Sequence, residues 1–105
     1  MDSLAEHTET VVEIDRELMS VVPDYLESRR LDCHTIECLL RAGDLVGIRT
    51  LGHRLKGSGG SYGFDEISEI GEILENAALV GDAVNIESSV ERLKIYLSRI
   101  KVVYV

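Results

Sequence analysis

The chain has 105 residues, a length that suits one domain and leaves little room for two. Hydrophobic residues make up 45% of it and charged residues 29%, a balance that supports a packed core and argues against wholesale disorder. Its 19 acidic residues outnumber the 11 basic ones. A net charge of -8 makes the chain a poor general ligand for nucleic acids and for anionic membranes, since both are polyanions.

The start of the chain is acidic and has neither the basic nor the apolar stretch of a secretory signal. No apolar run approaches the ~20 residues that a membrane span needs. Cys33 and Cys38 fall on different faces of one expected helix, so they are badly placed to bridge each other and both are expected to be reduced. We therefore expect a cytoplasmic protein in which residues 1–10 form a loose N-terminal arm.

Three short capping sequences divide the rest of the chain into helical segments, because in each a glycine ends one helix and an acidic residue caps the next. These sequences are Gly43-Asp44, Gly63-Phe64-Asp65 and Gly81-Asp82. A shorter segment precedes Pro23, whose fixed φ suits the first turn of a helix. In that segment Ile14, Leu18 and Val22 share a face and Asp15 is a plausible cap, which predicts a short N-terminal helix.

Each of the long segments carries an apolar stripe at a spacing of three or four residues, as an amphipathic helix requires. In chain order the stripes are Leu26, Cys33, Ile36 and Leu40; Ile48, Leu51, Leu55, Ser58 and Tyr62; Ile67, Ile70, Leu74, Ala77 and Ala78; and Ile86, Val90, Leu93, Leu97 and Ile100. Short loops between long helices make neighbours antiparallel. The sequence therefore predicts an all-α protein, an up-down-up-down four-helix bundle in one domain over residues 1–105, closed at one end by the short N-terminal helix. The last four residues are expected to extend the final helix or to hang loose.

The second long segment is unusual because five glycines, each costing roughly 1 kcal/mol relative to alanine, lie inside its helical period. They are Gly47, Gly52, Gly57, Gly59 and Gly60. A helix that tolerates so many glycines is expected to need bare backbone on one side. At ~100° per residue His53 points away from the apolar stripe, with Arg49 one turn before it and Lys56, Gly57 and then Gly60 after it.

These surroundings favour phosphoryl chemistry at an exposed imidazole. A neutral imidazole is a competent nucleophile near neutral pH, and cleared space beside it lets a second protein bring in a phosphoryl group. Lys56 and Arg49 would offset the charge on that group. The chain has no glycine-rich nucleotide loop and no carboxylate cluster for Mg²⁺, so the phosphoryl group must come from one partner and go to another.

The segment from Leu51 to Gly63 closely resembles the active-site helix of histidine-containing phosphotransfer (HPt) domains, which carry His-x-Leu-Lys-Gly, then small residues and a further glycine. The flanking helices match in length and order, so the resemblance covers nearly the whole chain. It implies that His53 accepts a phosphoryl group on Nε2 and that Lys56 and Gly57 belong to the site. It also implies that receiver domains, of response regulators or hybrid sensor histidine kinases, dock on this face and bring their own Mg²⁺ and aspartate.

Members of this family often place a polar or acidic side chain of the next helix against the imidazole. Glu75, on the flank of the third apolar stripe, is the candidate for this role, whereas Glu72 points further out. The expected protein is a monomeric phosphorelay intermediate that carries the group covalently between receiver aspartates. It is expected to have no cofactor or metal of its own and not to act as an enzyme.

Two other interpretations stay open. One is a helical adaptor, a degenerate HPt domain, that binds a signalling partner without chemistry. The other is a small helical metal binder at Cys33, His34 and Cys38, although ligands at these spacings do not converge on one helical face. For His34 and His7 an ordinary surface histidine is the expected role, since neither has surroundings like those of His53.

Overall fold

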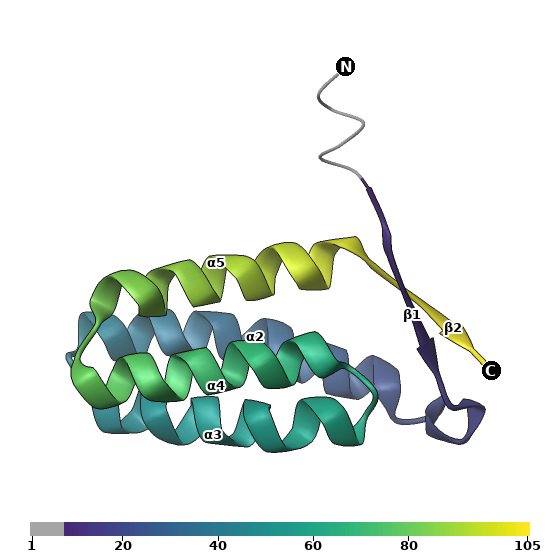
Figure 1. The fold of residues 1–105 in the computed structure, drawn as a ribbon, viewed down its shortest axis with the longest axis horizontal. Coiled ribbons are helices and arrows are strands. Elements are labelled where there is room, and N and C mark those ends of the chain that lie inside the picture. Colours follow the sequence, from purple (N-terminus) through teal and green to yellow (C-terminus); the bar gives the residue numbers. More distant parts are fainter. Residues whose placement is uncertain (1–7) are drawn as a thin grey trace.

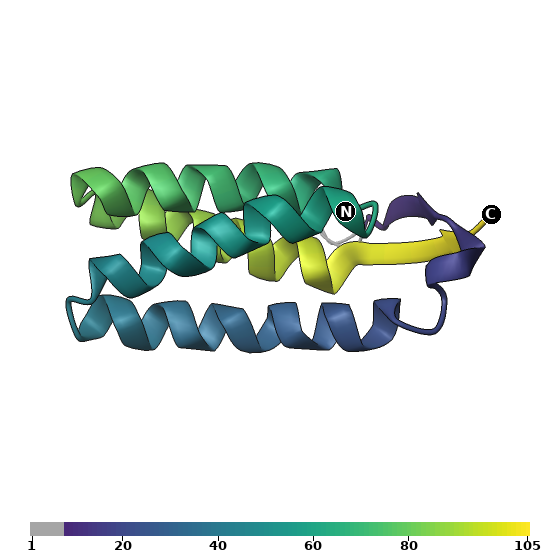
Figure 2. The same cartoon turned by 90° about the horizontal axis from the view of Figure 1, so that it is seen from below.

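The computed structural model describes residues 8–105, and within them four long helices pack side by side (Figure 1). These are α2 (Val22–Arg41), α3 (Leu45–Ser61), α4 (Asp65–Val80) and α5 (Ala83–Arg99). α3 lies closely along α4, and further helix–helix contacts join α4 to α5, α5 to α2 and α2 to α3 (Figures 1 and 2). The predicted all-α four-helix bundle is confirmed.

The turns between the helices follow the predicted caps. Gly81 adopts a positive φ of 73°, and the Asp82 side chain accepts a hydrogen bond from a backbone N–H in the first turn of α5. The turn at residues 43–44 is built in the same way. The middle turn differs by one position, because Phe64 is the N-cap and Asp65, predicted as the cap, is the first helical residue. There its carboxylate still faces the positive end of the helix dipole.

The predicted short N-terminal helix is wrong. Thr10–Ile14 form strand β1, which pairs in parallel with strand β2 (Ile100–Tyr104). Between β1 and α2 there is only a single 3-10 turn, Arg16–Leu18, which Asp15 caps through the backbone N–H of Glu17. Both strands are rich in β-branched residues, which favour extended backbone. The two strands are far apart in the sequence, with all four long helices between them.

The strand pair closes one end of the bundle, beyond the ends of the helices (Figure 1). Ile14 is fully enclosed there, and a Cβ on Gly63 would lie 2.7 Å from its Cδ1. The last residues neither extend α5 nor hang loose, because Val105 N–H donates to the carbonyl of Ile14 at 2.9 Å. Of the predicted loose arm, Thr10 belongs to β1, and residues 1–7 lie outside the described part of the chain.

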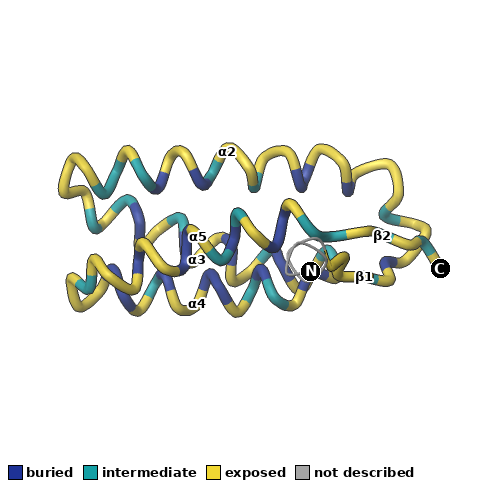
Figure 3. The backbone as a smooth tube through the Cα atoms, turned by 90° about the horizontal axis from the view of Figure 1, so that it is seen from above, coloured by how far each residue is buried: buried dark blue, intermediate teal, exposed yellow. Residues whose placement is uncertain are grey.

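The buried residues form one hydrophobic core, most of it aliphatic, and Figure 3 marks the buried positions along the helices. The predicted stripes supply most of it, and the single phenylalanine, Phe64, is completely buried within it. Some members of the stripes are only half-buried, namely Leu40, Leu51, Ser58, Tyr62 and Ile100. No helix within residues 8–105 is both long enough and apolar enough to cross a membrane.

Candidate functional site

His53 lies in the middle of α3 with 72% of its side chain exposed, on the side that its helical position predicts. Its Nδ1 is 2.9 Å from Oε2 of Glu75, which reaches across from α4 and is itself only 22% exposed. A carboxylate can only accept in such a contact, so in a neutral ring Nδ1 carries the proton and Nε2 keeps its lone pair. The neighbouring helix thus fixes which imidazole nitrogen faces outward as an acceptor.

Glu75 also contacts Lys56. The Lys56 ammonium lies 4.0 Å from Oε1, the carboxylate oxygen that His53 does not use. One side chain of α4 therefore holds two of the predicted site residues of α3, while Glu72 is exposed on α4. The Lys56 side chain is 47% exposed, so its contact with Glu75 does not shield it from a ligand.

The two arginines of α3, the predicted site residue Arg49 and its neighbour Arg54, lie on different sides of the helix. Arg49 is exposed one turn before His53 and forms no ion pair within residues 8–105. Arg54 instead lines a shallow hollow between α2 and α3 together with Arg29 and Asp32. Arg49 therefore stays on the His53 side of the helix, whereas Arg54 belongs to a separate surface.

Apart from Gly47, where a Cβ would lie 2.9 Å from the carboxylate of the N-cap Asp44, the glycines of α3 fall into two groups. A Cβ on Gly57 would meet nothing within 4 Å, and one on Gly60 would come no closer than 3.5 Å to another atom. Gly52 and Gly59 are buried against α4, where a Cβ would lie 2.8 Å and 2.5 Å from backbone nitrogens. The expectation of bare backbone on one side therefore describes only Gly57 and Gly60. The buried pair has another function, which is to let the two helices approach closely.

Gly71 of α4, which was not among the residues predicted from the sequence, completes this close approach. A Cβ at Gly71 would lie 2.4 Å from the backbone nitrogen of Lys56 and 2.7 Å from the carbonyl oxygen of Gly52. Backbone therefore packs on backbone, which brings the Glu75 side chain within reach of His53. A glycine inside an apolar-period helix was the available signal.

Exposure alone does not distinguish His53 from His34, whose side chain is 76% exposed and whose Nδ1 lies 3.9 Å from a Glu37 oxygen. What distinguishes His53 is the hydrogen bond of 2.9 Å to its carboxylate and the open glycine backbone beside it. An ammonium alone does not distinguish it, because Lys94 pairs with the Glu37 carboxylate beside His34 at 2.6 Å. His7 lies outside the described residues.

Cys33, His34 and Cys38, the residues of the alternative metal-binding interpretation, all lie on α2. Residues 8–105 contain no group of three metal-ligating side chains placed to hold an ion. Cys33 is buried, and this burial raises the pKa of its thiol to about 11, whereas Cys38 is exposed. The two cysteines are both free.

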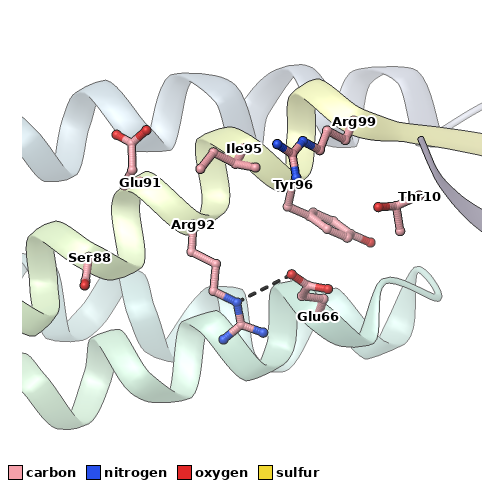
Figure 4. Close-up of a pocket in the computed structure, with 8 residues that line it drawn as sticks. All are labelled: Thr10, Glu66, Ser88, Glu91, Arg92, Ile95, Tyr96 and Arg99. Carbon is pink, nitrogen blue, oxygen red and sulfur yellow. Dashed lines mark ion pairs between the residues drawn. The ribbon is translucent and has the colours of Figure 1, made fainter. Parts of the chain in front are cut away.

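A shallow hollow of about 410 Å³ lies between α4, α5 and the start of β1 (Figure 4). Two arginines, Arg92 and Arg99, line this hollow. Arg92 pairs with Glu66 at 3.5 Å and with Glu69 at 3.1 Å. Burial raises the pKa of Tyr96 to about 12, so this phenol stays neutral. None of the lining residues comes from α3, and the hollow is separate from the His53 surface.

An antiparallel four-helix bundle with an exposed, glycine-flanked histidine has the architecture of a phosphotransfer domain. Residues 3–102 match the family model described as the Hpt domain, and the chain belongs to this family. Hpt domains are phosphotransfer carriers in phosphorelays rather than catalytic enzymes, and they interact with receiver domains of two-component systems. Neither the comparison with curated proteins nor that with solved structures found a match.

Proposed function

We propose that the chain is a phosphorelay intermediate that carries a phosphoryl group on Nε2 of His53 between receiver-domain aspartates. The observation that carries this proposal is the hydrogen bond between His53 Nδ1 and Glu75, since it leaves the lone pair on the outward nitrogen. The receivers would belong to response regulators or to hybrid sensor histidine kinases.

In the accepting step, Nε2 attacks the phosphorus of the receiver's aspartyl phosphate. The N–P bond forms as the P–O bond to the aspartate breaks, and the aspartate leaves as a carboxylate. The imidazole keeps its Nδ1 proton and gains positive charge, which the Glu75 carboxylate stabilises at 2.9 Å. Transfer to a second receiver reverses the same bonds.

The other predicted site residues act on the incoming group or on its carrier. Lys56, and Arg49 one turn before His53, offset the charge on the transferring phosphoryl oxygens. Gly57 and Gly60 leave the backbone open beside the imidazole, so a receiver can approach closely. We place the Mg²⁺ on the receiver, and we propose a monomeric carrier in the cytoplasm that needs no cofactor and binds no nucleic acid.

The direct test is incubation of the chain with a phosphorylated receiver domain. The phosphoryl group should move to the chain as an acid-labile, base-stable modification, and His53→Gln should abolish it without loss of folding. His34→Gln is the matched control, because that side chain is equally exposed, and it should be labelled like the wild type. A chain that binds the receiver but never takes the label would instead be a helical adaptor.

A further inference from the structure

Ser68 of α4 inserts its hydroxyl group into the backbone of α3. Its Oγ donates to the carbonyl of Lys56 at 2.7 Å and accepts from the N–H of Gly60 at 2.7 Å. These are the acceptor and the donor, four residues apart, that an α-helix pairs directly. One side chain from a neighbouring helix therefore bridges a backbone pair of the helix that carries His53.

This bridge falls where α3 is least able to hold its own conformation. Gly57, Gly59 and Gly60 follow Lys56, and each glycine costs roughly 1 kcal/mol of helix stability relative to alanine. A side chain that enters the hydrogen-bond ladder also opens the helix locally. The turn just after the site is therefore held by α4 rather than by its own helical propensity.

Lys56 is consequently held by α4 at both ends. Its carbonyl oxygen accepts from Ser68, and its ammonium lies 4.0 Å from Glu75. Ser68 and Glu75 are seven residues apart, which is two turns of α4, so both lie on the face that contacts α3. Gly71 lies between them on that face, directly against the Lys56 backbone nitrogen.

We propose that Ser68 is a positioning residue for phosphoryl transfer, because its hydroxyl clamps the Lys56–Gly60 turn onto α4 and so fixes the Lys56 ammonium beside His53. The clamp acts through Lys56 and never touches the phosphoryl group. This inference rests on the function proposed above.

Ser68→Ala tests the clamp, because it removes one oxygen and leaves the Lys56 carbonyl and the Gly60 N–H free to pair directly. The variant should therefore fold with a thermal midpoint near that of the wild type. Single-turnover transfer from a phosphorylated receiver should be slower at saturating receiver by roughly tenfold, as expected for a displaced charge, while the half-saturating receiver concentration changes little. Hydrogen exchange at the Gly60 amide should change as its acceptor changes.

Ser61→Ala is the matched control. Its hydroxyl donates to the Gly57 carbonyl at 3.1 Å within α3 itself, so its loss removes a similar bond in the same turn without a link to α4. It should transfer at the wild-type rate. If Ser68→Ala fails to fold, Ser68→Cys replaces it, since a thiol keeps the volume and hydrogen-bonds more weakly.

A wild-type saturating rate in either Ser68 variant would overturn the clamp. A rate loss equal to that of Ser61→Ala would do the same. In both cases the wild-type chain still takes the label on His53, so the proposed function stands. If the wild-type chain takes no label at all, the proposed function fails first, and the clamp has no reaction to position.

Discussion

The Glu75 carboxylate contacts the imidazole of His53 with one oxygen and the ammonium of Lys56 with the other. The position of His53 on the solvent side of α3 followed from helical periodicity within one segment. The partners of His53 on α4 depend on the register between two helices, which no single-segment pattern contains. The family resemblance identified Glu75 as a candidate, whereas Ser68 and Gly71 were missed for this reason.

Glu75→Gln should separate the charge of this side chain from its hydrogen-bonding capacity. The amide oxygen can still accept from Nδ1–H, but it offers no charge to stabilise the ring as it becomes positive. Single-turnover transfer should slow by about tenfold, consistent with the ~1.4 kcal/mol by which charged hydrogen bonds exceed neutral ones. Folding should be retained, because the side chain is already partly exposed.

The measurement is the transfer rate at saturating receiver, compared with the rate of Glu72→Gln. Glu72 lies on the same helix but is exposed, so its replacement should leave the rate unchanged. Equal rates for the two variants would remove Glu75 from the mechanism.

At the scale of the helices, the boundaries and core faces of α2 to α5 were predictable because each depends on local spacing and on a glycine or aspartate at its end. The large number of glycines in α3 predicted a surface free of side chains, and this describes Gly57 and Gly60. It does not describe Gly52 and Gly59, which are buried against α4. Single-helix patterns cannot separate a glycine that clears an exposed surface from one that packs against another helix.

Gly57→Leu should leave the protein as stable as the wild type or more stable, by something under ~1 kcal/mol, because leucine is the better helix former and Gly57 faces open space. Phosphotransfer should nevertheless fall steeply, since a bulky side chain beside the imidazole blocks the receiver. Thermal unfolding and single-turnover transfer measure the two effects separately.

Gly71→Ala is the opposite case and serves as its control. A Cβ there would lie 2.4 Å from the Lys56 nitrogen, so the helices must separate and the thermal midpoint should fall together with transfer. If Gly57→Leu lost stability and kept transfer, the surface centred on His53 would have to be abandoned.

On the scale of the whole molecule, the structure joins the start and end of the described chain in one parallel strand pair. Helical spacing of Ile14, Leu18 and Val22 suggested a helix in this region, and this was wrong. The short segments at the two ends each resemble a frayed terminus when considered alone. Their pairing depends on the bundle bringing them together, which is a non-local effect that periodicity does not report.

Deletion of residues 101–105 should therefore lower stability without affecting the chemistry. It removes most of β2 and uncovers Ile14, whose burial is worth about 1.5–3 kcal/mol. The thermal midpoint should fall, while the folded fraction should accept a phosphoryl group at the wild-type rate, because the strands close the end of the bundle and none of the described contacts of His53 involves them (Figure 1). A transfer rate that fell at full folding would show that this end of the molecule contributes to receiver docking.

The most direct test of the central claim is to map the phosphoryl group on the labelled wild-type chain, at the level of the residue and of the ring nitrogen. The chain offers three histidines, His7, His34 and His53. After incubation with a phosphorylated receiver, peptide mapping under alkaline conditions and phosphorus NMR should place a single phosphoryl group on Nε2 of His53. A phosphoryl group on His7 or His34, or on Nδ1 of His53 where Glu75 holds the proton, would contradict the account.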